Sequence, residues 1–223
     1  MCVKHSSHYF SSQVHTERIL LILKNKYIFQ TNTSQNFLFK QLNQETIRHS
    51  IRVAEIASVL AKYIDIEPEL AYDCGIWHDA GKTKILNIIS KQEKLSEDEW
   101  AEIKKHPIYG VSVIDELYEG KYKEIVKETA LYHHCRVNNG GYPQEIAKPI
   151  LSNLIQILAI SDCFEAMTAK RVYKEKINPI IAKEMILDGK CGEFSKKILE
   201  IFENAFEEIS TITRADIEKK TVL

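Results

Sequence analysis

Apolar side chains recur along the chain at the spacing of amphipathic helices, and no pair of segments alternates apolar and polar residues as strands do. The clearest helix covers residues 44–63, with Ile47, Ile51 and Ala54 on one face. A Ser-x-x-Glu capping box at Ser96 opens another. Together with these two, the predicted helices are residues 17–26, 44–63, 68–81, 96–106, 121–132, 151–168, 178–187 and 195–209. We therefore predict an all-α fold.

The length of 223 residues is enough for one domain with a sizeable core. A hydrophobic content of 44% and a charged content of 27% are ordinary for a globular protein. Residues 1–40 are polar with one short helical stretch, so we predict an N-terminal extension followed by a single helical domain over residues 41–223. The extension could be a dimerisation arm that makes a homodimer, a lid or an interaction tag, and the sequence does not choose between them.

Charge, hydropathy and cysteine spacing exclude several classes of function. The net charge of −1 argues against a broad basic surface, so we expect no nucleic acid polymer as a partner. The early apolar run at residues 19–23 is too short to span a bilayer and no signal peptide is apparent, so we expect no membrane association. The five cysteines form no CxxC pair, which favours a reducing compartment and a cytoplasmic location.

Residues 77–82, Trp-His-Asp-Ala-Gly-Lys, carry the most chemical information. Imidazoles and carboxylates are the usual ligands of catalytic divalent metals. Adjacent side chains on a regular helix diverge by roughly 100°, but at a helix end, which Gly81 supplies, Asp79 could bridge two cations while His78 binds one. Further candidates at helix-compatible positions make the set too large for one cation, so two metals fit better. The candidates are His49, His78, Asp79, His106, His133, His134 and Asp162.

Each candidate alone also has a simpler interpretation. Asp162 lies in an apolar stretch where an unpaired carboxylate is costly. A metal ion, a buried arginine or the N–H groups of a neighbouring helix that it caps would compensate it. His106 could be a hydrogen-bonded histidine at the helix break beside Pro107. Lys82 could bind a phosphate oxygen, or it could be a solvated lysine at a helix terminus. The prediction of a metal site therefore rests on the candidates taken together.

Five motifs in this order resemble the HD superfamily of metal-dependent phosphohydrolases, and within it the HD-GYP subgroup. The matching stretch runs from about residue 45 to residue 174. The motifs are His49 with Arg52-Val53, then His78-Asp79-Ala80-Gly81-Lys82, then His106-Pro107 with Gly110, then His133-His134 followed by Gly141-Tyr142-Pro143, and finally residues 161–166 with Asp162, followed by Arg171-Val172-Tyr173-Lys174.

The resemblance implies an HD-type helical domain that hydrolyses cyclic di-GMP to pGpG or GMP with a metal-activated hydroxide. It implies two or three divalent ions, Fe or Mn, bound by the candidate ligands above, with Glu45 as an extra carboxylate for a third ion. It makes Asp79 and Lys82 the catalytic residues. Lys82, Arg171, Lys174 and Tyr142 would bind the substrate.

The chain departs from the HD-GYP pattern after the double histidine, where Cys135 and Asn138-Asn139 replace the usual carboxylates. Groups around metal ligands tune their orientation and basicity, so the departure leaves the substrate open. The alternatives are another cyclic dinucleotide, a cyclic mononucleotide or a nucleotide monophosphate, or a catalytically weak sensor that binds nucleotide without turnover. For Cys135 itself we expect packing rather than metal binding.

Overall fold

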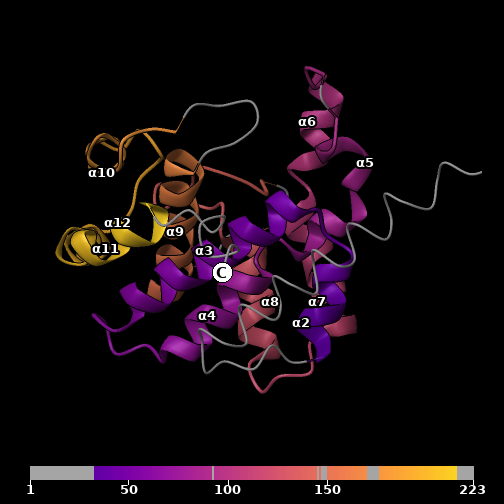
Figure 1. The fold of residues 1–223 in the computed structure, drawn as a ribbon, viewed down its shortest axis with the longest axis horizontal. Helices are drawn as coiled ribbons and strands as arrows, with labels where there is room; N and C mark the ends of the chain where they lie inside the picture. The colour runs from indigo at the N-terminus through magenta and orange to yellow at the C-terminus, as the bar shows by residue number, and fades with distance from the viewer. Residues whose placement is uncertain (1–32, 92, 145, 147–149, 170–175, 215–223) are drawn as a thin grey trace, which may run out of the picture.

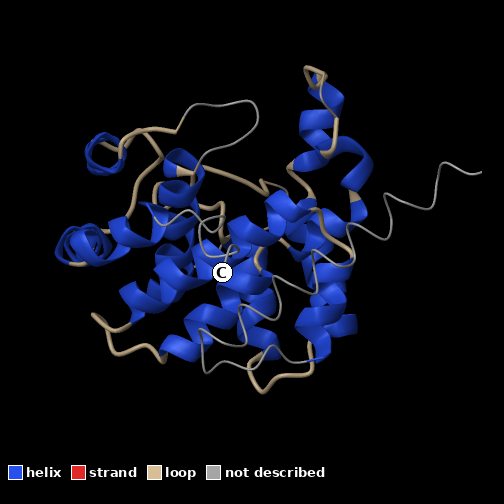
Figure 2. Ribbon diagram, in the orientation of Figure 1, coloured by secondary structure: helices blue, strands red, loops and turns tan. Residues whose placement is uncertain are grey.

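The structure is a computed structural model that describes residues 33–91, 93–144, 146, 150–169 and 176–214. Within these ranges the chain is built from helices and contains no β-strand (Figure 2), which confirms the predicted all-α fold. In chain order the elements are α2 (Thr33–Lys40), α3 (Gln44–Ala61), α4 (Pro68–Trp77), the 3₁₀ helix η1 (Ala80–Lys84), α5 (Leu86–Ile89), α6 (Glu97–Ile103), α7 (His106–Leu117), α8 (Lys123–Tyr132), α9 (Asn153–Thr168), α10 (Pro179–Leu187), α11 (Lys196–Asn204) and α12 (Phe206–Arg214).

The helices α3 and α9 form the centre of the fold. The face of α3 that carries Ile47, Ile51 and Ala54 is buried, as its spacing predicted. Helix α9 is buried on nearly every side, which is typical of a helix without a polar face. Figure 1 shows α3 and α4 in the middle, with α7 and α8 on one side and α10, α11 and α12 on the other. Helices α3 and α9, which lie far apart in the sequence, thereby pack against each other.

Side chains at the helix starts explain where several elements begin. The side chain of Asn43 accepts a hydrogen bond from the backbone N–H of Thr46 at 2.8 Å and caps α3. Ser96 and Glu99 form the predicted capping box of α6. Pro68 occupies the first turn of α4, where its missing N–H has no helical partner to lose.

Three predicted helix ends were wrong. The helix from Ser96 ends at Ile103, and His106 begins a new helix with Pro107 in its first turn, a position that proline favours. The helix from Pro68 ends at Trp77, and a 3₁₀ helix continues through the predicted stop to Lys84. The segment 195–209 forms two helices that meet at Ala205.

The first described helix, α2, was not predicted. Its residues Leu38 and Phe39 are buried in the same core as α3 and α9. The predicted helix over residues 17–26 lies outside the described residues, so the division into an extension of residues 1–40 and a domain of residues 41–223 stays a prediction. Among the described residues, no helix combines the length and the apolar character needed to cross a bilayer.

The crossing of α3 and α4 generates a prediction about stability. A Cβ added to Gly75 would lie 2.3 Å from the Cα atom of Ala54, so the two backbones pack directly against each other. We expect Gly75→Ala to lower the free energy of unfolding by about 1–3 kcal/mol, because the helices must move apart to accept it. Urea unfolding followed by circular dichroism measures the change.

Gly110→Ala is the matched control, since this glycine also lies within a helix. A Cβ there meets nothing closer than 3.6 Å. We expect the unfolding free energy to stay the same or to rise by up to about 1 kcal/mol, because alanine restricts the unfolded chain. Equal unfolding midpoints for the two variants would contradict the close crossing.

Candidate metal centre

The predicted ligands converge from separate helices. His49 lies within α3 and Asp162 within α9, both on buried faces. His78 and His133 follow the last residues of α4 and α8, and His106 begins α7. Because neighbouring side chains diverge on a regular helix, these helix ends let the His-Asp and His-His pairs turn toward one point.

Buried histidines of the site are held by hydrogen bonds at Nδ1. In three rings Nδ1–H donates to the carbonyl oxygen of the residue three positions earlier, at 2.6 Å for His78, 2.8 Å for His106 and 2.7 Å for His133. In His49 the same atom contacts the carboxylate of Glu165. Such bonds fix the tautomer and leave Nε2 of each ring available to the centre of the site.

The ligand atoms gather in two groups, and within each group all of them lie within 4.8 Å of one another. The first group contains His49, His78 and Asp79, all buried. The second contains His106 and His133, which are buried, and His134, which is half-buried. Two adjacent groups of three ligands suit two ions better than one.

Two carboxylates connect these groups. Asp79 places Oδ1 3.1 Å from Nε2 of His106, and Oδ2 3.4 Å from Nε2 of both histidines in the first group. Asp162 places Oδ1 3.1 Å from Nε2 of His49, and Oδ2 3.6 Å from Nδ1 of His134. Each carboxylate therefore faces both groups, as a ligand that bridges two cations must.

Contacts between nitrogen atoms indicate that this donor set fits metal ions. Nε2 of His49 lies 3.2 Å from Nε2 of His78, and Nε2 of His106 lies 3.3 Å from Nε2 of His133. When Nδ1 carries the ring proton, each contact brings two lone pairs together unless a cation or a further proton lies between them. Divalent cations bound by these histidines would remove this repulsion and neutralise the adjoining carboxylates.

The electrostatic environment keeps two histidines and two aspartates of the set in the protonation states that metals require. Burial and neighbouring imidazoles hold the pKa of His133 and of His134 well below the usual range. Burial alone would raise the pKa of Asp79, but Lys82 and the nearby histidines outweigh it and hold this pKa well below its usual range. Burial would also raise the pKa of Asp162, but the surrounding histidines outweigh it and hold this pKa well below its usual range. The neutral imidazoles of His133 and His134 thus face the ionised carboxylates.

Glu165 is a candidate that we did not predict from the sequence. It is fully buried in α9 and contacts His49. It accepts a hydrogen bond from Nε of Arg52 at 2.6 Å and forms an ion pair with Nη2 of the same residue at 2.5 Å. Burial lowers the pKa of His49, but Glu165 and Asp162 raise it to about 9. Glu165 therefore orients the His49 ring and increases its basicity. The signal in the sequence was a glutamate in the most apolar helix, one turn after Asp162.

Two further predicted residues lie beside the ligand groups. Nζ of Lys82 is 2.5 Å from Oδ2 of Asp79, and 21% of the Lys82 side chain is exposed. Glu45 lies on α3 one turn before His49, outside both groups, and lines an adjacent pocket. Because its side chain is partly exposed, Lys82 lies at the accessible edge of the site.

The predicted substrate-binding residues are only partly within the described structure. The ring of Tyr142 lies 4.3 Å from the ring of His134, centroid to centroid, at an interplanar angle of 32°. Tyr142 therefore borders the second ligand group. Arg171 and Lys174 lie outside the described residues, so their predicted contacts with substrate stay predictions.

The loop that departs from the HD-GYP pattern lies beside the ligand groups without joining them. Cys135 is buried and packs against Leu151 and Ile155, as expected for a packing role. The side chain of Asn138 accepts a hydrogen bond from the backbone N–H of Gly140 at 2.9 Å. Neither residue belongs to the two ligand groups among the described residues.

Asp79→Asn tests the link between the two groups. The substitution keeps the shape of the side chain but removes the negative charge, so we expect the purified protein to lose at least one bound divalent ion. Inductively coupled plasma mass spectrometry measures the metal content per chain. Asp115→Asn, at an exposed carboxylate of α7, should keep the parental content. Full metal content in Asp79→Asn would contradict the bridging arrangement.

Glu165→Gln tests whether this carboxylate tunes His49. We expect the affinity for a divalent metal to fall about 10–100-fold, because an amide neither raises the basicity of the ring nor balances Arg52. Competition with a chelating dye measures the affinity. Glu116→Gln, at an exposed position of α7, is the matched control. Equal affinities for the two variants would show that Glu165 has no effect on the site.

Several curated proteins are similar to this chain. A cyclic di-GMP phosphodiesterase of Vibrio cholerae is 28% identical over 76% of the chain, and a 3′3′-cGAMP-specific phosphodiesterase 2 of the same organism is 30% identical over 76%. A cyclic di-GMP phosphodiesterase of Thermotoga maritima is 26% identical over 87%. The chain spans 38%, 33% and 54% of the lengths of these relatives, so it matches one part of each.

A solved structure has the same fold. The HD domain of the phosphodiesterase PgpH of L. monocytogenes aligns with a TM-score of 0.61 at 20% sequence identity, which covers 82% of this chain and 99% of that domain. The same domain in complex with cyclic-di-AMP aligns with a TM-score of 0.60. The sequence profile of the HD domain matches residues 27–191, which is well over half of the chain. This chain therefore belongs to the HD domain family.

Proposed function

We propose that this chain is a metal-dependent phosphodiesterase that hydrolyses a cyclic dinucleotide, as members of the HD-GYP subgroup do. The observation that carries the proposal is the pair of ligand groups connected by Asp79. Two divalent ions held side by side can stabilise both the attacking and the leaving oxygen of a phosphodiester. The relatives that are named as cyclic di-GMP and 3′3′-cGAMP phosphodiesterases support this assignment.

We propose two divalent ions, Fe or Mn, because the set is rich in imidazole, contains bridging carboxylates and lacks thiolates. When bound, the ions would supply an activated water and neutralise charge on the phosphoryl oxygens. Glu45 is the carboxylate proposed for a third ion. The ligands proposed for the two ions are His49, His78, Asp79, His106, His133, His134 and Asp162.

Among the residues that the structure describes, Lys82 is the one best placed to hold a phosphoryl oxygen. Its ammonium lies against Asp79 at the edge of the buried cluster, and part of the side chain is exposed to an incoming substrate. A fixed positive charge at this point stabilises negative charge that develops during phosphoryl transfer. Arg171 and Lys174, and Tyr142 beside the second group, complete the proposed substrate contacts on the strength of the HD-GYP resemblance.

Cyclic di-GMP is the first substrate that we propose, and 3′3′-cGAMP is the second. Both present guanine and phosphate to the same basic residues, and both are named among the relatives. Cyclic mononucleotides and nucleotide monophosphates share the same chemistry and belong in the same assay. A weak sensor has less support, because Cys135 and Asn138, which suggested it, lie outside the ligand groups.

We also propose a reducing, cytoplasmic location, in which small nucleotide signals are found. Support comes from the cysteines. Those of the described residues are all free thiols, namely Cys74, Cys135, Cys163 and Cys191.

Product analysis tests the proposed function. Protein loaded anaerobically with Fe²⁺ or Mn²⁺ is incubated with cyclic di-GMP, 3′3′-cGAMP and cyclic mononucleotides, beside an Asp79→Ala control. We expect linear pGpG or GMP from cyclic di-GMP only when Asp79 is present. Full metal occupancy with no turnover of any substrate would refute the phosphodiesterase and favour the sensor.

Lys82→Ala tests the role of the ammonium group. We expect kcat/KM for the cyclic dinucleotide to fall about 10–100-fold, a loss typical of removing one group that stabilises transition-state charge. The metal content should stay at the parental level, because Lys82 is not a ligand. Lys84→Ala, on the same 3₁₀ helix but exposed, should keep the parental kcat/KM. A similar loss in both variants would mean that the effect of Lys82 is not local.

A further inference from the structure

We propose that Trp100 of α6 forms a stacking subsite for a nucleobase of the substrate. This inference rests on the proposed function, since it places the base of the same nucleotide whose phosphodiester lies at the metal centre. It assigns binding to a helix outside the motifs that carry the HD-GYP resemblance.

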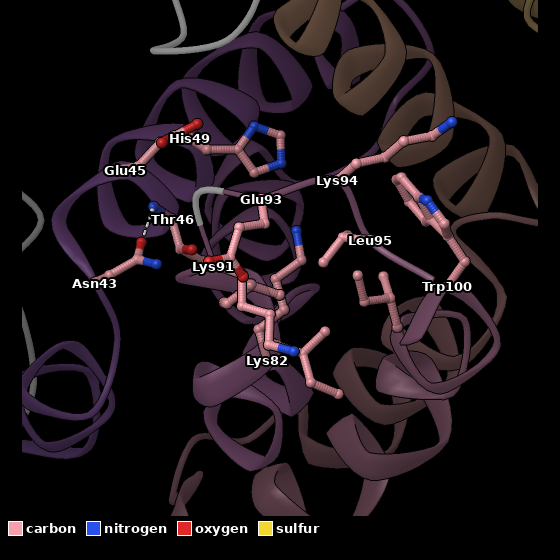
Figure 3. A pocket seen from close by; sticks show the side chains of 13 residues that line it. Asn43, Glu45, Thr46, His49, Lys82, Lys91, Glu93, Lys94, Leu95 and Trp100 are labelled. Carbon is pink, nitrogen blue, oxygen red and sulfur yellow. Dashed lines mark hydrogen bonds between the residues drawn. The ribbon is translucent and has the colours of Figure 1, made fainter. Parts of the chain in front are cut away.

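The subsite belongs to a pocket with a volume of about 640 Å³. Pockets of roughly 300–1,000 Å³ are typical of small-molecule sites. His49 and Lys82, which belong to the metal centre, line it together with Trp100. Figure 3 shows His49 and Glu45 at one edge of the pocket and Trp100 at the opposite edge. One molecule can therefore contact the metal centre and the indole ring together.

The wall of the pocket around Trp100 is apolar. Ile88 and Ile89 of α5, Leu95 of the following loop and Ile103 of α6 line it, and all four are half-buried. Lysine, glutamate and asparagine side chains line the remainder. An apolar wall next to polar groups matches a nucleobase, which has apolar faces and hydrogen-bonding edges.

The fold itself does not require Trp100. The side chain is 53% exposed, and α6 has no buried residue. Figure 1 shows α5 and α6 projecting together from the body of the molecule. A large aromatic ring on such a helix contributes little to the core, whereas its exposed face can stack on a planar base. Binding therefore accounts for the tryptophan better than stability does.

The charges in the pocket suit the rest of a nucleotide. Lys82 and Lys94 bring positive charge to opposite parts of the lining, and Lys91 pairs with Glu99 of α6. A phosphodiester bound at Lys82 would therefore leave its sugar and base directed along the pocket toward Trp100. Lys94 would lie close enough to this end of the pocket to contact a second phosphate.

Tryptophan fluorescence gives a readout of stacking that does not depend on turnover. The chain has two tryptophans, and Trp77 is fully buried, so ligand-induced quenching reports Trp100. Metal-loaded protein is titrated with a hydrolysis-resistant phosphorothioate analogue of cyclic di-GMP. We expect quenching in the parental protein and its loss in Trp100→Phe.

Affinities from calorimetry separate stacking from other effects. We expect Trp100→Ala to weaken binding of the analogue about ten-fold or more, and Trp100→Phe to weaken it less, because a phenyl ring still stacks. Binding of inorganic phosphate, which has no base, and the metal content should stay unchanged. Phe37→Ala removes an equally exposed aromatic ring from α2 and should change nothing.

The outcomes distinguish this subsite from the proposed function. Unchanged affinity in Trp100→Ala, or equal losses in the alanine and phenylalanine variants, would overturn the stacking subsite even if cyclic di-GMP is hydrolysed. Quenching with the expected loss of affinity, but no hydrolysis, would support the subsite and overturn the phosphodiesterase. A parental protein that neither binds the analogue nor hydrolyses cyclic di-GMP would overturn both.

Discussion

The structure depends on the balance of charge in a buried cluster of imidazoles and carboxylates. Asp79 and Asp162 face histidine nitrogen atoms from two ligand groups, and neighbouring Nε2 atoms approach to 3.2 Å and 3.3 Å. Such a cluster is unfavourable without compensation, because burial weakens the solvation of every charge and lone pair. Helices α3, α4, α7, α8 and α9 all contribute to it or end beside it. The packing of the domain therefore depends on the same buried side chains that could hold cations.

The sequence predicted the membership of this cluster well and its surroundings less well. The candidate ligands could be predicted because five of the eight histidines lie in the motifs and the motifs occur in a fixed order. The extent of α3 followed from apolar periodicity, and that of α9 followed from the length of its apolar stretch. Helix ends near Pro107 and Gly81 were wrong, because a proline permits a helix to start as readily as it ends one, and a 3₁₀ helix has no clear periodic signal.

Residues that contact the candidate ligands or line the adjacent pocket, but had no assigned role in a motif, were harder to predict. Glu165 lies inside the motif of residues 161–166, but only Asp162 was assigned a role there. The role of Glu165 depends on α3 and α9 placing it beside His49 and Arg52. Helices α5 and α6 together form an arm that projects from the body of the molecule (Figure 1). The position of Trp100 at a pocket wall depends on the orientation of this arm, which apolar periodicity does not specify. Arg171 and Lys174 illustrate the opposite case, since a motif predicts a role for residues outside the described structure.

In the proposed function, the arm formed by α5 and α6 would separate the chemistry of this domain from its choice of nucleotide. The proposed metal ligands lie in a densely packed interior, where one altered side chain disturbs several neighbours. The arm has few such neighbours, so its surface residues can change at small cost to folding. Domains with the same catalytic interior can thereby acquire preferences for different cyclic dinucleotides by substitutions in a short exposed segment. Selection can then act on signal identity while the hydrolytic centre remains constant.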